Sequence, residues 1–163
     1  YRTKGWDLSV EYLLDPARFG VQKDLGTFRF TLTGNKLESL RFTEDPSDPL
    51  SADETVGQSL VPEYQANFDV TWKRGDLLVN YGYNWFDETR RFEGVADDYI
   101  DPRYFNHDAR STHDVQVRYQ VRDDVSLYGG VNNLGDQQPS RGNVDYPVSP
   151  LGRFFYVGLN LNL

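Results

Sequence analysis

Hydrophobic and polar residues alternate with a period of two along most of this chain. In the clearest stretch, Ala66, Phe68 and Val70 occupy one set of positions, and Asn67 and Asp69 lie between them. Such alternation gives a β-strand one apolar and one polar face. Nothing in the chain predicts a helix longer than a turn or two. The sequence therefore predicts seven strands, most of a length that crosses a bilayer when tilted, over residues 6–14, 28–42, 64–73, 77–86, 114–121, 125–132 and 155–163.

The connections between the predicted strands alternate between short and long. Residues 73–76 and 122–124 have the Gly and Asp content of tight hairpins, and the link at 15–25 is intermediate. In an up-and-down meander, every second connection lies at the same end of the sheet, so all long loops are expected together. Short turns at one end and long loops at the other are typical of outer-membrane barrels. The long polar segments are 43–63, 87–110 and 133–151.

Aromatic residues stand near both ends of the apolar faces. In the first predicted strand, Trp6 and Tyr12 flank Leu8 and Val10. Amphipathic rings on either side of an aliphatic centre suit the two headgroup levels of a membrane. We therefore predict that six aromatic residues lie at the membrane interfaces: Trp6, Tyr12, Tyr64, Trp72, Tyr83 and Trp85.

The opposite faces carry Asn, Gln, Asp, Thr and Arg, which do not suit a dry protein core. A water-filled or plugged barrel interior accepts such side chains. They would line the path of a solute or simply keep the interior wet. The residues predicted to face the lumen are Asp7, Glu11, Arg29, Asn67, Asp69, Asn80, Asn84, Gln116 and Arg118.

Composition excludes several other classes of protein. The 163 residues include 17 basic and 25 acidic ones, a net charge of −8, so no cationic face for nucleic-acid phosphates is expected. The absence of cysteine excludes disulfides, thiolate zinc sites and cysteine nucleophiles. No run approaches the roughly 18 apolar residues of a membrane-spanning helix. Membrane-spanning strands are not detected in this way, because their apolar and polar residues alternate. Methionine is also absent and the sequence opens at Tyr1, so we expect a processed or excised piece.

Two segments near the end of the chain resemble the last two strands of TonB-dependent outer-membrane receptors. Residues 124–136 end in Asn-Asn-Leu-Gly-Asp, and residues 151–161 carry the Gly-Arg that typically precedes the last strand. Residues 61–68 resemble the start of an upstream strand in these receptors. The resemblance thus covers most of residues 61–163, whereas residues 1–60 fit the alternation without a motif of their own.

The alternation and the resemblance together predict an all-β fold, an antiparallel up-and-down meander of about seven strands. The resemblance implies that residues 1–163 form the C-terminal portion of a large transmembrane β-barrel whose plug domain and remaining strands are not in this chain. It implies an outer-membrane receptor of a Gram-negative bacterium, not an enzyme, that binds a scarce solute and imports it. The implied partners are the remaining barrel and plug, the lipid bilayer, the TonB–ExbB–ExbD complex and a siderophore-iron complex or oligosaccharide, with no cofactor.

Few residues point to a specific site. In the loop at 87–110, five residues are candidates for contact with a ligand, although an ordinary solvated loop surface also accounts for them: Asp97, Asp98, Tyr99, Asp101 and Tyr104. His107 and His113 lack a ligand cluster at the usual spacing, so we expect no metal site. No Ser-His-Asp array or nucleophile elbow is present, so no catalytic residue is predicted.

Two other readings of the pattern are open. A complete small barrel of eight strands, with a structural or adhesive role, needs only about this length of chain. The odd strand count and the Asn-Asn-Leu-Gly-Asp motif oppose it. A soluble β-sandwich also alternates, but it gives no reason for long and short connections to be sorted by end.

Overall fold

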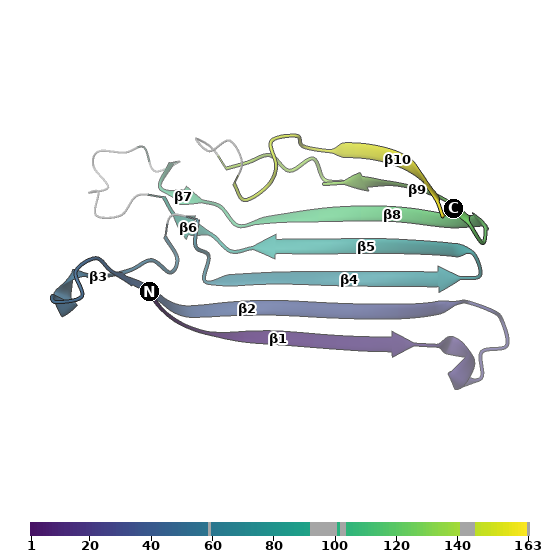
Figure 1. Cartoon of the computed structure of the whole chain (residues 1–163), viewed down its shortest axis with the longest axis horizontal. Coiled ribbons are helices and arrows are strands. Elements are labelled where there is room, and N and C mark those ends of the chain that lie inside the picture. Colours follow the sequence, from purple (N-terminus) through teal and green to yellow (C-terminus); the bar gives the residue numbers. More distant parts are fainter. Residues whose placement is uncertain (59, 92–100, 102–103, 141–145, 163) are drawn as a thin grey trace.

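A computed structural model describes residues 1–58, 60–91, 101, 104–140 and 146–162. Its main feature is an antiparallel sheet whose seven long strands follow one another in the order β1-β2-β4-β5-β8-β9-β10 (Figure 1). The short strand β3 pairs with β2 beside this path. Each long strand therefore lies next to its neighbour in sequence, which confirms the predicted up-and-down meander.

The seven long strands coincide with the seven predicted ones. Two of them begin four residues earlier than the alternation predicted, because backbone pairing starts before the first residue of the alternation. The strands are β1 (Arg2–Leu14), β2 (Thr27–Thr43), β4 (Tyr64–Arg74), β5 (Leu77–Phe86), β8 (Arg110–Arg122), β9 (Val125–Asn132) and β10 (Phe154–Leu161).

A β-bulge interrupts the pairing of the second strand with the first. The register of β1 against β2 shifts between Lys4 and Gly5, opposite Glu38. The Glu38 carboxylate accepts a hydrogen bond from Trp6 Nε1 at 2.8 Å and forms an ion pair with Lys4 at 2.7 Å. An extra residue in one strand reverses the faces beyond it. Leu40 keeps the even parity of Phe30 but pairs with Thr3, so it lies on the opposite face of the sheet.

Short elements lie in the connections. The 3-10 helix η1 (Pro16–Phe19) joins β1 to β2, and the Asp15 side chain caps it by accepting the Ala17 N–H. The sequence predicted neither this helix nor the short elements of the long loops. Within the described ranges, no helix has the length that would carry it across a membrane. The long loops contain η2 (Pro49–Ser51), β3 (Ala52–Glu54), β6 (Thr89–Arg90) and β7 (Asn106–His107).

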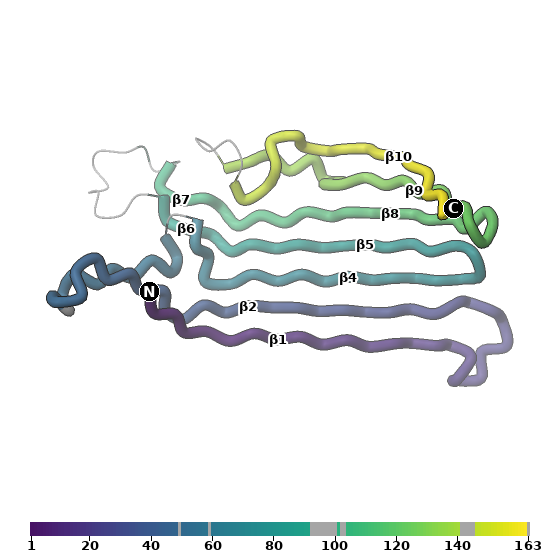
Figure 2. The backbone as a smooth tube through the Cα atoms, in the orientation of Figure 1, coloured from purple at the N-terminus to yellow at the C-terminus, as the bar shows by residue number. Residues whose placement is uncertain are grey.

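Short and long connections occupy opposite ends of the sheet, as predicted. The links β1–β2, β4–β5 and β8–β9 lie at the right in Figure 1, which we name the short-turn end. The links β2–β4, β5–β8 and β9–β10 lie at the left, which we name the long-loop end. The tube in Figure 2 shows the same arrangement. All three long connections therefore gather at one end of the strands.

The register gives the sheet one apolar and one polar face. A row of directly paired residues on the apolar face runs across all seven strands: Tyr12, Phe30, Val70, Tyr81, Val115, Val131 and Phe155. The adjacent row, on the other face, is mostly polar or small: Leu13, Arg29, Thr71, Asn80, Gln116, Gly130 and Tyr156. Pairing therefore joins the alternation of single strands into two continuous surfaces.

No second layer of the described chain covers the apolar face. Leu8 is 54% exposed and Val157 is 86% exposed. Among the described Ala, Val, Ile, Leu, Phe, Trp and Tyr residues, Val148 alone is buried, and it lies in the β9–β10 loop. Within the described residues, this sheet is therefore not one half of a packed sandwich.

Candidate functional site

The nine residues predicted to face a lumen all lie on the polar face. The register places Asn67 opposite Asn84, and Asn80 opposite Gln116. Polar contacts join neighbouring strands: Asn35 Nδ2 donates to Asp7 Oδ1 at 2.7 Å, and Arg29 pairs with Glu11 at 3.8 Å. Both partners of the Arg29–Glu11 pair are more than half exposed, so the pair contributes little stability. The face is a hydrophilic wall made by seven strands.

Tyrosine rings cover glycines where this wall reaches β9 and β10. Tyr128 stands opposite Gly158, and Tyr156 stands opposite Gly130. A Cβ atom on Gly130 would lie 2.6 Å from the Tyr156 hydroxyl, and one on Gly158 would overlap the Tyr128 ring. The tyrosine rings therefore lie across the backbone, and only glycine leaves room for them.

The six predicted interface aromatics all lie on the apolar face. The ring nitrogens of two of them have partners: Trp6 Nε1 donates to Glu38, and Trp72 Nε1 donates to the Leu25 carbonyl at 2.7 Å. These two lie near opposite ends of the sheet, as an interface position requires. Tyr83 differs, because it pairs with Phe68 inside the sheet and its ring lies 5.1 Å from that of His113.

The predicted ligand cluster in the β5–β8 loop lies largely outside the described residues. Asp97, Asp98 and Tyr99 are among the residues not described. Asp101 and Tyr104 are described, and the Tyr104 N–H donates to the Asp101 carbonyl at 2.9 Å. Tyr104 is 40% exposed. The grouping of these five side chains stays a prediction.

A cavity of about 320 Å³ lies on the polar face at the long-loop end. It opens between the last residues of β5, the first residues of β8 and the β9–β10 loop. The sequence alone gave no signal for it, because its walls come from segments up to about 70 residues apart. The lining residues are Asn84, Phe86, Thr112, Asp114, Asn132, Asn133, Pro147, Val148, Ser149, Leu151, Gly152 and Phe154.

Asn133 lines this cavity directly after the end of β9 and stabilises the turn there. Its φ is +52°, and its side chain closes a turn by accepting the Gln137 N–H and donating to the Gln137 carbonyl, both at 2.8 Å. Its own N–H donates to Asp114 Oδ1 at 2.7 Å. Asn133 is only 7% exposed. The first part of the Asn-Leu-Gly-Asp motif therefore fixes the start of the β9–β10 loop.

Asp136 fixes the other end of the same loop. Its carboxylate Oδ1 accepts the Arg153 N–H at 2.8 Å. Gly152, whose φ is +62°, leaves space for that oxygen, which would lie 2.5 Å from a Cβ atom there. The motifs at 133–136 and 152–153 are thus two halves of one clasp at the loop base, which we name the loop clasp. The resemblance depends on residues that shape the loop.

The long loops also contact one another. The Arg90 N–H donates to the Gly57 carbonyl at 2.7 Å, which joins the β5–β8 loop to the β2–β4 loop. The buried His107 ring lies edge-on to Tyr146 at 5.3 Å, which joins β7 to the β9–β10 loop. Burial and the nearby Arg91 guanidinium lower the pKa of His107. Within the described ranges, no three acidic or histidine side chains gather closely enough to hold a metal ion.

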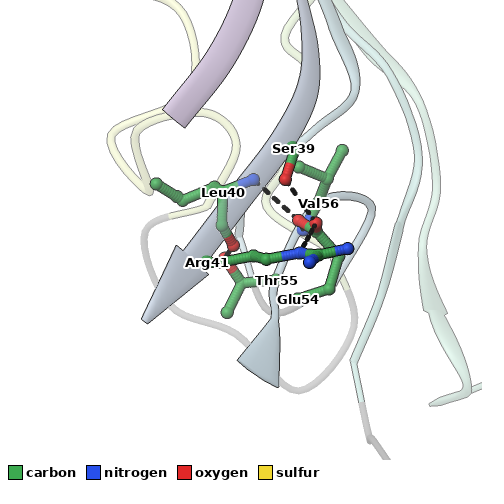
Figure 3. Close-up of polar contacts among 6 residues, drawn as sticks. All are labelled: Ser39, Leu40, Arg41, Glu54, Thr55 and Val56. Atoms are coloured by element: carbon green, nitrogen blue, oxygen red, sulfur yellow. Dashed lines mark hydrogen bonds and ion pairs between the residues drawn. The ribbon is translucent and has the colours of Figure 1, made fainter. Parts of the chain in front are cut away.

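Glu54 fastens the β2–β4 loop onto β2. Its carboxylate accepts the Ser39 hydroxyl at 2.6 Å, the Leu40 N–H at 2.7 Å and Arg41 Nε at 3.2 Å (Figure 3). These bonds, led by that from Ser39, lower the pKa of Glu54 from 4.5 to about 2. The carboxylate is therefore ionised at neutral pH and holds β3 against the end of β2.

Comparison with known proteins identifies a family whose members contain a sheet of this kind. Residues 1–134 match the family model described as TonB dependent receptor-like, beta-barrel. A comparison with curated proteins gives no match.

Three solved structures share the fold. A mutant of the ferric enterobactin receptor PfeA from Pseudomonas aeruginosa has a TM-score of 0.63 and 15% identity, over 99% of this chain and 22% of that one. The copper transporter OprC has a TM-score of 0.60 and 16% identity, over 98% of this chain and 23% of that one. The ferric-catecholate import receptor Fiu from E. coli K12 has a TM-score of 0.55 and 12% identity, over 99% and 21%. The chain thus spans about a fifth of the length of these proteins.

Proposed function

The chain belongs to the family of TonB-dependent receptor β-barrels, and from this premise we propose that it forms part of the wall of a receptor that imports a scarce solute across the outer membrane. The family is one of transport receptors, not a class of enzymes. The observation that carries the proposal is the two-faced sheet: an apolar face left uncovered by the described chain, and a polar face across all seven strands. Acyl tails would cover the first face, and the barrel interior would hydrate the second.

In this proposal residues 1–163 are the C-terminal portion of a barrel of about 22 strands. Among the described strands, β1 pairs only with β2, and β10 pairs only with β9. Unpaired backbone groups in lipid cost several kcal/mol each, so the remaining strands of the receptor would pair with these edges. The likeness of residues 124–136 and 151–161 to the last two strands of the family supports this placement.

The sorting of loops supports one orientation. The short turns would face the periplasm of a Gram-negative bacterium, and the long-loop end would face the outside. The cavity beside Asn84 and Phe154 would then lie where an incoming solute first meets the barrel wall.

The solute would be a siderophore-iron complex or an oligosaccharide, and its import would draw energy from the TonB–ExbB–ExbD complex through a plug domain. The similar structures, a ferric enterobactin receptor and a copper transporter among them, support import of a scarce nutrient.

The proposal is tested by uptake in the native bacterium. Cells with the receptor, cells without it, and cells without TonB are compared for growth on limiting iron and for uptake of labelled oligosaccharides. We expect the uptake of one class of solute to require both the receptor and TonB. Equal uptake with and without TonB would contradict energised transport.

A further inference from the structure

The cavity at the long-loop end offers mixed donors and acceptors on one wall. Asn84 Nδ2 donates to Thr112 Oγ1 and Asp114 Oδ2, both at 3.3 Å. The side-chain oxygen of Asn84, Oδ1, has no partner in the described part of the chain, and the Thr112 hydroxyl keeps its own hydrogen to donate. Asn132 and Ser149 add a further amide and hydroxyl to the lining. A group that both donates and accepts, such as an alcohol, matches this set.

Aromatic and aliphatic side chains form the rest of the lining. Phe86 and Phe154 come from β5 and β10, and Val148 and Leu151 come from the loop above. Apolar surface beside a few fixed polar groups is the usual composition of a small-molecule site, and about 320 Å³ is near the lower end of the usual range. The C–H faces of a sugar ring pack on such rings, while its hydroxyls reach the amides.

The charge of the lining argues against an anionic ligand. The described lining residues include no lysine, arginine or histidine, and the one ionisable group is the carboxylate of Asp114. That carboxylate already accepts from the Asn133 N–H and from Asn84. Anionic chelates are normally recognised by Arg or Lys, and the chain as a whole carries a charge of −8.

From this chemistry we infer that the cavity binds one or two rings of an uncharged oligosaccharide. The inference rests on the proposed function and narrows its solute from two classes to one. Phe154 supplies the stacking face, and Asn84 with Thr112 supplies the hydroxyl contacts.

The test uses the intact receptor and calorimetry with maltotriose, cellotriose, xylotriose and ferric enterobactin. Phe154→Leu keeps the bulk but removes the ring, and the matched control is Phe155→Leu on the apolar face of the same strand. We expect at least one trisaccharide to bind, and Phe154→Leu to weaken it about five- to tenfold while Phe155→Leu leaves it unchanged. A second variant, Leu151→Lys, alters a loop residue that is 74% exposed and should also weaken binding without unfolding the wall.

The outcomes separate this inference from the transport proposal. Binding of ferric enterobactin but of no trisaccharide, absence of all binding, or equal effects of the two phenylalanine variants would overturn the inference. TonB-dependent uptake of iron would still support the transport proposal in each case. Trisaccharide binding that requires Phe154, with uptake indifferent to TonB, would uphold the site and refute energised import.

Discussion

The middle of the sheet and its long-loop end are held together by different means. In the middle, side chains such as Leu8 and Val117 are 54% and 41% exposed, and the backbone ladder carries the structure. At the long-loop end, several side chains are buried although they are mostly polar: Thr89, His107, Asn133, Ser140 and Val148.

The difference shows which region depends on its surroundings. The loops at the long-loop end build their own contacts, through side chains that bond to backbone groups, as Glu54 does with Leu40. The middle has no core of its own among the described residues, so its stability must come from strand pairing and from whatever covers its two faces. A charge placed in the middle of the sheet should therefore lower the stability of the receptor more than the loss of a contact at the long-loop end.

The largest effect is expected at Phe68, in the middle of the apolar face. Phe68→Arg should destabilise the intact receptor in lipid vesicles by about 2–4 kcal/mol, because the charge would enter hydrocarbon. The matched control is Asn67→Arg on the polar face of the same strand, which should cost far less. Denaturant unfolding in vesicles measures both, and equal costs would mean that the faces are wrongly assigned.

A smaller effect is expected at Gly130, where the wall is closely packed. Gly130→Ala would place a methyl group 2.5 Å from the Val115 carbonyl oxygen and 2.6 Å from the Tyr156 hydroxyl. We expect a loss of about 1–3 kcal/mol, as for other overpacked sites. Gly34→Ala is the control, since its new atom would meet only the Gln65 carbonyl at 3.8 Å. The same unfolding assay should show Gly34→Ala close to wild type, and a matching loss there would refute the packing explanation.

At the long-loop end, Asp136→Ala removes one half of the loop clasp. The Arg153 N–H loses its acceptor, so we expect a cost of about 1 kcal/mol. Limited proteolysis of the receptor should cut the β9–β10 loop faster. Asp53→Ala, at an exposed aspartate of β3, is the control and should leave that loop unchanged. An unchanged cleavage rate in Asp136→Ala would show that the clasp does not hold the loop.

The smallest effect is a loosening of β3 in acid. The pKa of Glu54 is lowered from 4.5 to about 2, so its stabilising contribution is complete above about pH 4.5 and is lost as the pH falls toward 2. Hydrogen exchange at the Leu40 amide, corrected for its intrinsic pH dependence, should lose protection over that range. Glu54→Gln should remove the transition, and a transition that persists in that variant must belong to another group.

The candidate site was less predictable than the fold. The alternation placed Asn84 and Asp114 on polar faces, but it did not place them at one cavity with Phe154. That juxtaposition depends on how the β9–β10 loop folds back, which Asn133, Asp136 and Gly152 determine through a side-chain network and positive φ angles. Bonds of this kind between separate segments do not produce a periodic pattern in the sequence, so they could not be predicted from it.

The sequence by itself determined the strands and the polarity of their two faces, because a period of two is a property of each strand alone. It also determined the order of the strands, because the alternating short and long connections predict an up-and-down meander. Only the tertiary structure decided that the single-strand faces join into continuous surfaces with no second protein layer among the described residues, and that the two C-terminal motifs meet in one clasp. Those features depend on register and loop closure, which arise between segments distant in the chain.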